Sequence, residues 1–140
     1  RTALVGREAH PALAGRISQE ELGALQHVMV QLVPSKTFRD RVCIAYERAG
    51  VDRDVVLAVP SFTAAAAVAA GTDLVATLPS SFLAAHGARI GLRPVKGPVP
   101  AHEVTISLCW HERTHVDPAM MAFRLLVRRA VRSDGRTRAR

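Results

Sequence analysis

Three apolar runs along this chain each end in Pro-Ser and lead into a segment with helical spacing. These runs occupy residues 28–35, 55–61 and 74–80. A short apolar run bounded by Pro is typical of a buried strand, and the Ser that follows is a strong helix N-cap. Strands that alternate with helices build a parallel sheet. We therefore expect the three Pro-Ser turns at one carboxyl edge, where open α/β sheets bind ligands and helix N-termini attract anions.

The remaining pattern adds a short opening strand and a closing helix to this core. Ser18 and Glu21 form a capping box, Gly50 is placed to end a helix, and Asp117 precedes a Pro that can start another. Alternation over residues 104–110 predicts a half-buried strand. The expected strands cover residues 3–7, 28–33, 55–59, 74–78, 92–95 and 104–110, and the main helices cover 36–49, 63–70 and 117–131. The predicted fold class is α/β, a parallel-rich sheet with flanking helices.

The formal charge of +7 is concentrated at the end of the chain. Six arginines follow Val127, namely Arg128, Arg129, Arg132, Arg136, Arg138 and Arg140. Without them and Asp134, 13 basic and 11 acidic residues remain, so residues 1–127 carry a net charge of only +2. We expect residues 132–140 to form a solvated, partly disordered basic tail rather than a DNA contact.

The sequence argues against several functional classes. No apolar run approaches the roughly 20 residues of a membrane span. The chain has no Gly-x-Ser-x-Gly elbow and no phosphate-binding or dinucleotide-binding glycine pattern, so we expect neither an enzyme nor a cofactor. His111 and His115 have the spacing of a metal pair but flank a predicted strand end and a loop, so no metal site is predicted. Cys43 and Cys109 resemble small core residues of a cytoplasmic protein.

Six segments carry a more specific pattern, in residues 25–28, 49–51, 55–63, 71–79, 105–111 and 117–118. Together they resemble the effector-binding domain of LysR-type transcriptional regulators, especially members that sense aromatic or other small carboxylates. The resemblance implies a fold like that of type 2 periplasmic binding proteins, in which two α/β lobes hold an effector between them. Residues 1–131 would supply the second lobe and the strand and helix that return to the first. The N-terminal winged helix-turn-helix and most of the first lobe are not among these residues.

The resemblance also implies where the second lobe meets its effector. His27 matches a His that contacts the ligand in aromatic-sensing members, and Ser61 lies at an often polar position. Phe62 either stacks on the effector or plugs the core, and Thr63 with the free N–H groups of its helix could take a carboxylate. Further pocket candidates are Ser35, Ser80 and Trp110. For all these residues a structural role, as a helix cap or a core side chain, is the alternative.

The helix expected over residues 36–49, together with strand 55–59, resembles the element that packs against a partner subunit. This implies a homodimer or homotetramer, with Phe38, Arg39, Val42 and Tyr46 as interface candidates. The implied function is a cytoplasmic effector sensor that binds a small organic acid and controls DNA binding through a domain outside these residues. Alternatives are a solute-binding protein or a stand-alone ligand-binding domain of the same fold, or an inert fragment that only dimerises.

Overall fold

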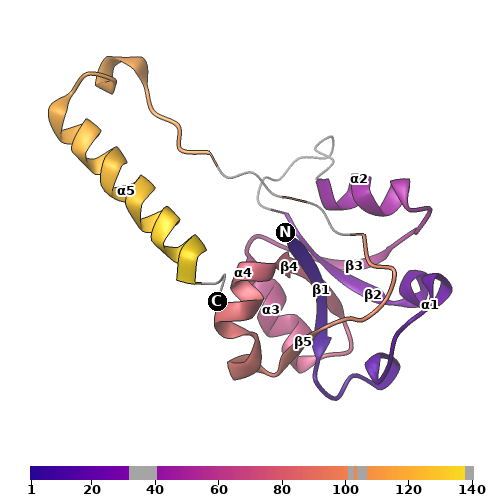
Figure 1. Cartoon of the computed structure of the whole chain (residues 1–140). Coiled ribbons are helices and arrows are strands. Elements are labelled where there is room, and N and C mark those ends of the chain that lie inside the picture. Colours follow the sequence, from indigo (N-terminus) through magenta and orange to yellow (C-terminus); the bar gives the residue numbers. More distant parts are fainter. Residues whose placement is uncertain (32–40, 101–102, 104–106, 138–140) are drawn as a thin grey trace. The chain divides into compact units, whose positions relative to one another are not determined.

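The chain divides into two compact units in a computed structural model that describes residues 1–31, 41–100, 103 and 107–137. The first unit, Arg1–Val104, contains a β-sheet and is called the sheet unit below. The second, Thr105–Arg140, contains the long helix α5 (Pro118–Thr137) and is called the helix unit. Figure 1 shows the elements of both units.

The sheet unit is built on five strands in the order β3-β2-β4-β1-β5 (Figure 1). The strands are β1 (Thr2–Arg7), β2 (Gln26–Val30), β3 (Asp54–Val59), β4 (Val75–Pro79) and β5 (Leu92–Pro94). Strand β2 is parallel to both β3 and β4, whereas β1 is antiparallel to β4 and β5. The carboxyl ends of β2, β3 and β4 therefore share one edge, as the Pro-Ser pattern predicts.

Helices cover both faces of this sheet. They are α1 (Gln19–Ala24), α2 (Arg41–Arg48), α3 (Phe62–Gly71) and α4 (Ser80–His86). Neighbouring residues of a strand point to opposite faces, and β1 illustrates this. Leu4 packs in a cluster with residues of α1 and α2, and Val5 packs in a second cluster with the alanines of α3. The fold class is thus confirmed as α/β with helices on both faces.

Short-range signals in the sequence correctly mark several helix ends. The Ser18 hydroxyl accepts a hydrogen bond from the Glu21 N–H at 3.1 Å, and the Glu21 carboxylate accepts one from the Ser18 N–H at 2.7 Å. Gly50 follows α2 with a φ of 67°, a conformation that glycine adopts without strain. At the start of α5 the Asp117 carboxylate accepts a hydrogen bond from the Met120 N–H at 2.8 Å.

Three expectations from the sequence are corrected. Ser80 is the first residue of α4 rather than its cap, because β4 continues through Pro79, which occupies the cap position. Residues 107–110 are exposed and form no strand; 104–106 lie outside the described residues. Helix α5 continues beyond Val131 to Thr137, into the segment expected to be a partly disordered tail. Among the described residues, no helix is both long and apolar enough to span a membrane.

Candidate functional site

The turn between β3 and α3 is the best-defined part of the carboxyl edge. Ser61 has an extended backbone, and its hydroxyl accepts a hydrogen bond from the Ala64 N–H at 3.1 Å. The same hydroxyl retains its proton as a donor. Phe62 is half-buried against the α3 side of the core, whereas Thr63 is exposed. The N–H groups of Phe62 and Thr63 lie in the first turn of α3, where amides have no acceptor within the helix.

The turn between β4 and α4 lies at the same edge, but one of its backbone N–H groups is already hydrogen-bonded within the sheet unit. The Ser80 N–H donates to the Arg1 carbonyl oxygen at 2.9 Å, which joins this turn to the start of β1. Ser80 is half-buried. Ser35, the candidate from the first Pro-Ser turn, lies outside the described residues. Of the two turns that the structure describes, the one at Ser61 therefore offers more available polar groups.

His27 lies in β2 with its side chain in the core rather than at the edge. Its exposed fraction is 1%, and its ring meets the Tyr46 ring edge-on, with 5.7 Å between centroids. Within the described residues neither ring nitrogen reaches a hydrogen-bond partner at ordinary geometry, although the nearby Leu22 backbone slightly favours the protonated ring. Burial, reinforced by the Arg53 cation, lowers the pKa of His27 to about 4, so the ring is neutral at pH 7. This position speaks against direct effector contact.

Tyr46, an interface candidate from the sequence, is also buried in the core of the sheet unit. Its side chain is 1% exposed, and its hydroxyl lies near that of Thr77 in β4, although neither hydroxyl makes a hydrogen bond of ordinary geometry within the described residues. Burial raises the pKa of Tyr46, an effect that Thr77 and the Arg53 cation partly offset. His27, Tyr46 and Thr77 thus form a polar cluster between β2, α2 and β4.

Arg53 was not singled out by the sequence, yet it organises this region. Its guanidinium lies over the Tyr46 ring, 4.7 Å from the centroid, and donates to the Cys43 sulfur at 2.9 Å. A cation over an aromatic face is attracted by the ring quadrupole. Arg53 therefore holds α2 through two of its side chains. The sequence signal that could have identified it is the position of Arg53 in the short loop between Gly50, which ends α2, and β3.

The remaining interface candidates do not form a described outward surface. Phe38 and Arg39 lie outside the described residues, and Val42 is half-buried against the core. The exposed apolar residues of this region lie instead on the edge strand β3, at Val55, Val56 and Leu57, with exposed fractions of 38%, 46% and 38%. The pairing of β2 with β3 is irregular here: His27 faces Val55 and Val28 faces Leu57, so Val56 has no counterpart.

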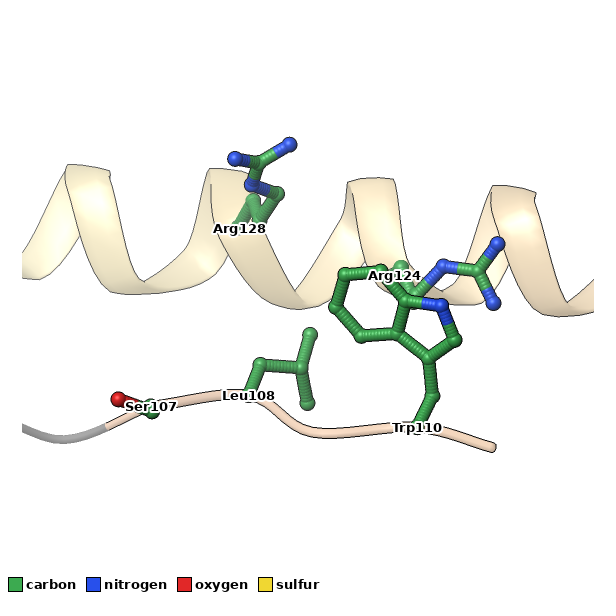
Figure 2. Close-up of a pocket in the computed structure, with 5 residues that line it drawn as sticks. All are labelled: Ser107, Leu108, Trp110, Arg124 and Arg128. Atoms are coloured by element: carbon green, nitrogen blue, oxygen red, sulfur yellow. The ribbon is translucent and has the colours of Figure 1, made fainter. Parts of the chain in front are cut away.

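Trp110 belongs to the helix unit and lines a pocket of about 310 Å³ (Figure 2). The other lining residues are Ser107, Leu108, Arg124 and Arg128. The Trp110 indole N–H donates to His115 Nδ1 at 3.1 Å, and the Arg124 guanidinium lies 4.8 Å from its ring centroid. These contacts fix Trp110 to the start of α5. No group of three or more metal-ligating side chains is found among the residues that the structure describes.

Comparison with known proteins decides the family. The family profile described as LysR substrate binding domain matches residues 1–132. This chain belongs to the LysR substrate-binding-domain family. The resemblance drawn from the sequence motifs is thus confirmed.

Several curated proteins with similar sequences are transcriptional regulators. The LysR-family chain is 33% identical to the HTH-type transcriptional activator NagR of Ralstonia sp over 120 residues, covering 86% of this chain and 39% of NagR. It is 31% identical to the activator NahR of Pseudomonas putida over 121 residues, covering 86% of this chain and 40% of NahR. The chain therefore spans about two fifths of the length of these relatives. These proteins are regulators rather than enzymes, as the sequence predicts.

Solved structures agree with this membership. The regulatory domain of MexT, a transcriptional activator of Pseudomonas aeruginosa, is similar with a TM-score of 0.71 and 27% identity over 91% of this chain and 60% of that one. A putative transcriptional regulator from Vibrio parahaemolyticus gives a TM-score of 0.68 at 25% identity, over 92% of this chain and 59% of that one. The two similarities support the periplasmic-binding-protein-like fold expected from the motifs.

Proposed function

We propose that this LysR-family chain senses a small organic acid at the turn between β3 and α3 and thereby controls a transcriptional regulator. The observation that carries the proposal is the arrangement of Ser61, Phe62 and Thr63 at the carboxyl edge of parallel strands. A carboxylate there would accept from the Ser61 hydroxyl and from amides in the first turn of α3. The half-exposed Phe62 ring would lie beside the apolar part of the acid, which favours an aromatic carboxylate.

The proposed mechanism is a shift between conformations of a two-lobed domain. An acid held between the lobes stabilises the arrangement in which both lobes contact it. The regulator then changes how its subunits present their DNA-binding domains, so effector binding and DNA binding are coupled. In this mechanism His27 supports the sheet from within, because its ring is buried in the core of the sheet unit.

The helix unit supports the proposal that residues 105–131 complete the other lobe. Five apolar side chains of the first half of α5 are between 44% and 62% exposed, namely Met120, Met121, Phe123, Leu125 and Leu126. Large apolar side chains exposed all round one half of a helix indicate that something packs on it. Since the chain spans about two fifths of its relatives, we assign this surface to the remaining part of the effector-binding domain.

The edge strand β3 supports assembly into a homodimer or homotetramer. An edge strand presents unpaired N–H and C=O groups, and Val55, Val56 and Leu57 add apolar surface to it. A partner subunit that packs along β3 and α2 would cover both the unpaired backbone groups and the apolar side chains of β3. We locate the interface at β3 rather than at Tyr46 for this reason.

The experiment that tests the effector site compares two helix caps in the full-length regulator. Ser61→Ala removes the cap of α3 and the proposed effector contact, whereas Ser18→Ala removes only the cap of α1. Both changes should lower stability by about 1 kcal/mol. Binding of benzoate and a set of aliphatic carboxylates is measured by calorimetry. We expect Ser61→Ala to weaken binding of the preferred acid about tenfold, since a hydrogen bond to a charged group contributes about 1.5–3 kcal/mol. Equal affinity of the Ser61→Ala and Ser18→Ala variants for the acid would refute an effector site at Ser61.

A further inference from the structure

Helix α5 changes chemistry halfway along its length. Residues 118–127 are mostly apolar and include one charged residue, Arg124. Residues 128–137 contain four arginines and a single acidic residue, Asp134. The arginines are Arg128, Arg129, Arg132 and Arg136. The helix therefore has an apolar half, which the rest of the effector-binding domain would cover, followed by a basic half that apolar packing does not explain.

Arg124 has a structural role within the helix unit, in contrast to the arginines that follow it. Its guanidinium donates to the carbonyl oxygens of Thr114 and His115 at 3.0 and 2.6 Å and lies over the Trp110 ring. Arg128 and Arg129 are exposed. Arg132 and Arg136 continue the spacing of four residues from Arg128 along the helix. At a rise of about 1.5 Å per residue, residues 128–136 extend over about 12 Å.

This spacing is unfavourable for an isolated helix. Like charges four residues apart destabilise a helix by about 0.2–0.5 kcal/mol per pair, and only part of this is offset by the attraction of cations to a helix C-terminus. A row of arginines that lacks matching acids is favourable when an external anion neutralises it. Phosphate groups are suited to this because each arginine can donate two parallel hydrogen bonds to one phosphate.

We propose that the basic half of α5 is a sequence-independent contact for duplex DNA, additional to the N-terminal DNA-binding domain through which LysR-type regulators bind DNA. The sequence alone favoured a solvated tail for residues 132–140. Continuation of α5 to Thr137 changes that interpretation, because it places residues 128–136 at fixed intervals along one helix. The contact would add affinity and salt dependence to DNA binding and would not select a base sequence.

The test uses the 140-residue chain and two charge-matched triple variants. The first carries Arg129→Gln, Arg132→Gln and Arg136→Gln, since glutamine has a similar helix propensity to arginine. The control carries Arg16→Gln, Arg89→Gln and Lys96→Gln, which are exposed positions of the sheet unit. Both variants have the same formal charge. Binding to a fluorescent duplex of arbitrary sequence is measured by anisotropy between 50 and 200 mM salt, with circular dichroism to compare helix content.

We expect the α5 variant to bind at least about tenfold more weakly at the lowest salt. The slope of log K against log salt should fall in magnitude by about 2–3, since each phosphate that is no longer neutralised removes about 0.9 from it. The control variant should keep most of the DNA affinity and most of the salt dependence. Equal losses in the two variants would show attraction by net charge alone and overturn the proposal. So would tighter binding of a polyglutamate peptide than of DNA, which would indicate an acidic protein partner.

Discussion

His10 and His27 are both buried in the sheet unit, but the two imidazole rings differ in their hydrogen bonding. His10 is 5% exposed and uses both nitrogens: Nδ1 accepts from the Ala12 N–H at 3.1 Å, and Nε2 lies 2.9 Å from the Asp73 carbonyl oxygen. His27 is 1% exposed and, within the described structure, uses neither nitrogen in a hydrogen bond of ordinary geometry. The His10 ring joins two loops through hydrogen bonds, whereas the His27 ring contributes to the core by packing.

The difference shows that a polar side chain can have either of two roles in a core. The His10 ring, together with the Arg7–Asp73 ion pair at 2.6 Å, joins the end of β1 to the loop before β4. Its Nε2 carries the proton, because a carbonyl oxygen can only accept. The His27 ring is held by packing edge-on against Tyr46 instead. Removing a hydrogen bond and removing a packed ring have different energetic consequences, so the two histidines can be distinguished by substitution.

The largest expected effect comes from removing the ring that encloses His27. Tyr46→Ala should lower the free energy of unfolding by about 3–5 kcal/mol, as other large-to-small changes of buried rings do. Tyr46→Phe keeps the packing and should cost less than about 1.5 kcal/mol. Urea unfolding measures both. The two variants should differ clearly, and similar losses in both would contradict a packing role for the ring.

Lowering the pH should have the next largest effect on the free energy of unfolding, through protonation of His27. The unfolded ring binds a proton below about pH 6.5, but the folded ring does so only below about pH 4. Between these values the unfolded state holds more protons, so stability falls as the pH is lowered through this window. The loss between pH 7 and pH 4.5 should reach about 2–3 kcal/mol from this residue. Urea midpoints at both pH values measure it, and a His27→Leu variant should lose less over the same interval.

Replacing each histidine by leucine at pH 7 sharpens the comparison directly. His10→Leu removes the acceptor of the Ala12 N–H and the partner of the Asp73 carbonyl, which should cost about 1–3 kcal/mol. His27→Leu exchanges a ring without regular hydrogen bonds for an apolar side chain of similar size. We expect a change of less than about 1.5 kcal/mol or a stabilisation. If His27→Leu proves as costly as His10→Leu, the ring of His27 takes part in a hydrogen bond that matters.

The smallest effect is expected at the ion pair beside His10. Asp73→Asn removes the charge that faces Arg7 but keeps the Asp73 backbone carbonyl that faces His10. The Asp73 side chain is 58% exposed, so the loss should stay below about 1 kcal/mol and shrink at high salt. Thermal unfolding at 0.1 and 1 M salt measures the difference. A larger loss would mean that the carboxylate positions the carbonyl on which His10 depends.

The parts of this fold that the sequence predicted well are those set by neighbouring residues. The Pro-Ser pattern placed the parallel strands and their common edge, and Ser18 with Glu21 marked the start of α1, because caps and strand ends depend on a few local groups. The family resemblance, carried by longer motifs, also held. These features can be predicted without knowing which face of a helix or strand is covered by other elements.

Apart from the start of α4 and the length of α5, the expectations from which the structure differs concern contacts between distant segments. Burial of His27 and Tyr46 depends on α2 lying over β2, which the pattern of either element alone does not reveal. Alternation over residues 104–110 predicts a strand, but a strand also needs a neighbour with which to pair. Residues 107–110 have no strand partner among the described residues, so the predicted strand is not formed there. The contacts proposed for Ser61, Phe62 and Thr63 remain predictions.

The reversed direction of β1 has a mechanical consequence for effector sensing. Because β1 is antiparallel to β4, its first residue pairs with Pro79, and the Arg1 carbonyl is tied to the Ser80 N–H at 2.9 Å. The chain thus enters the sheet at the rim where the parallel strands end, beside the proposed binding edge. A displacement of Arg1 would reach this rim directly through the backbone pairing of β1 with β4, without first deforming the packed interior. The start of the chain is in this sense anchored at the edge for which effector binding is proposed.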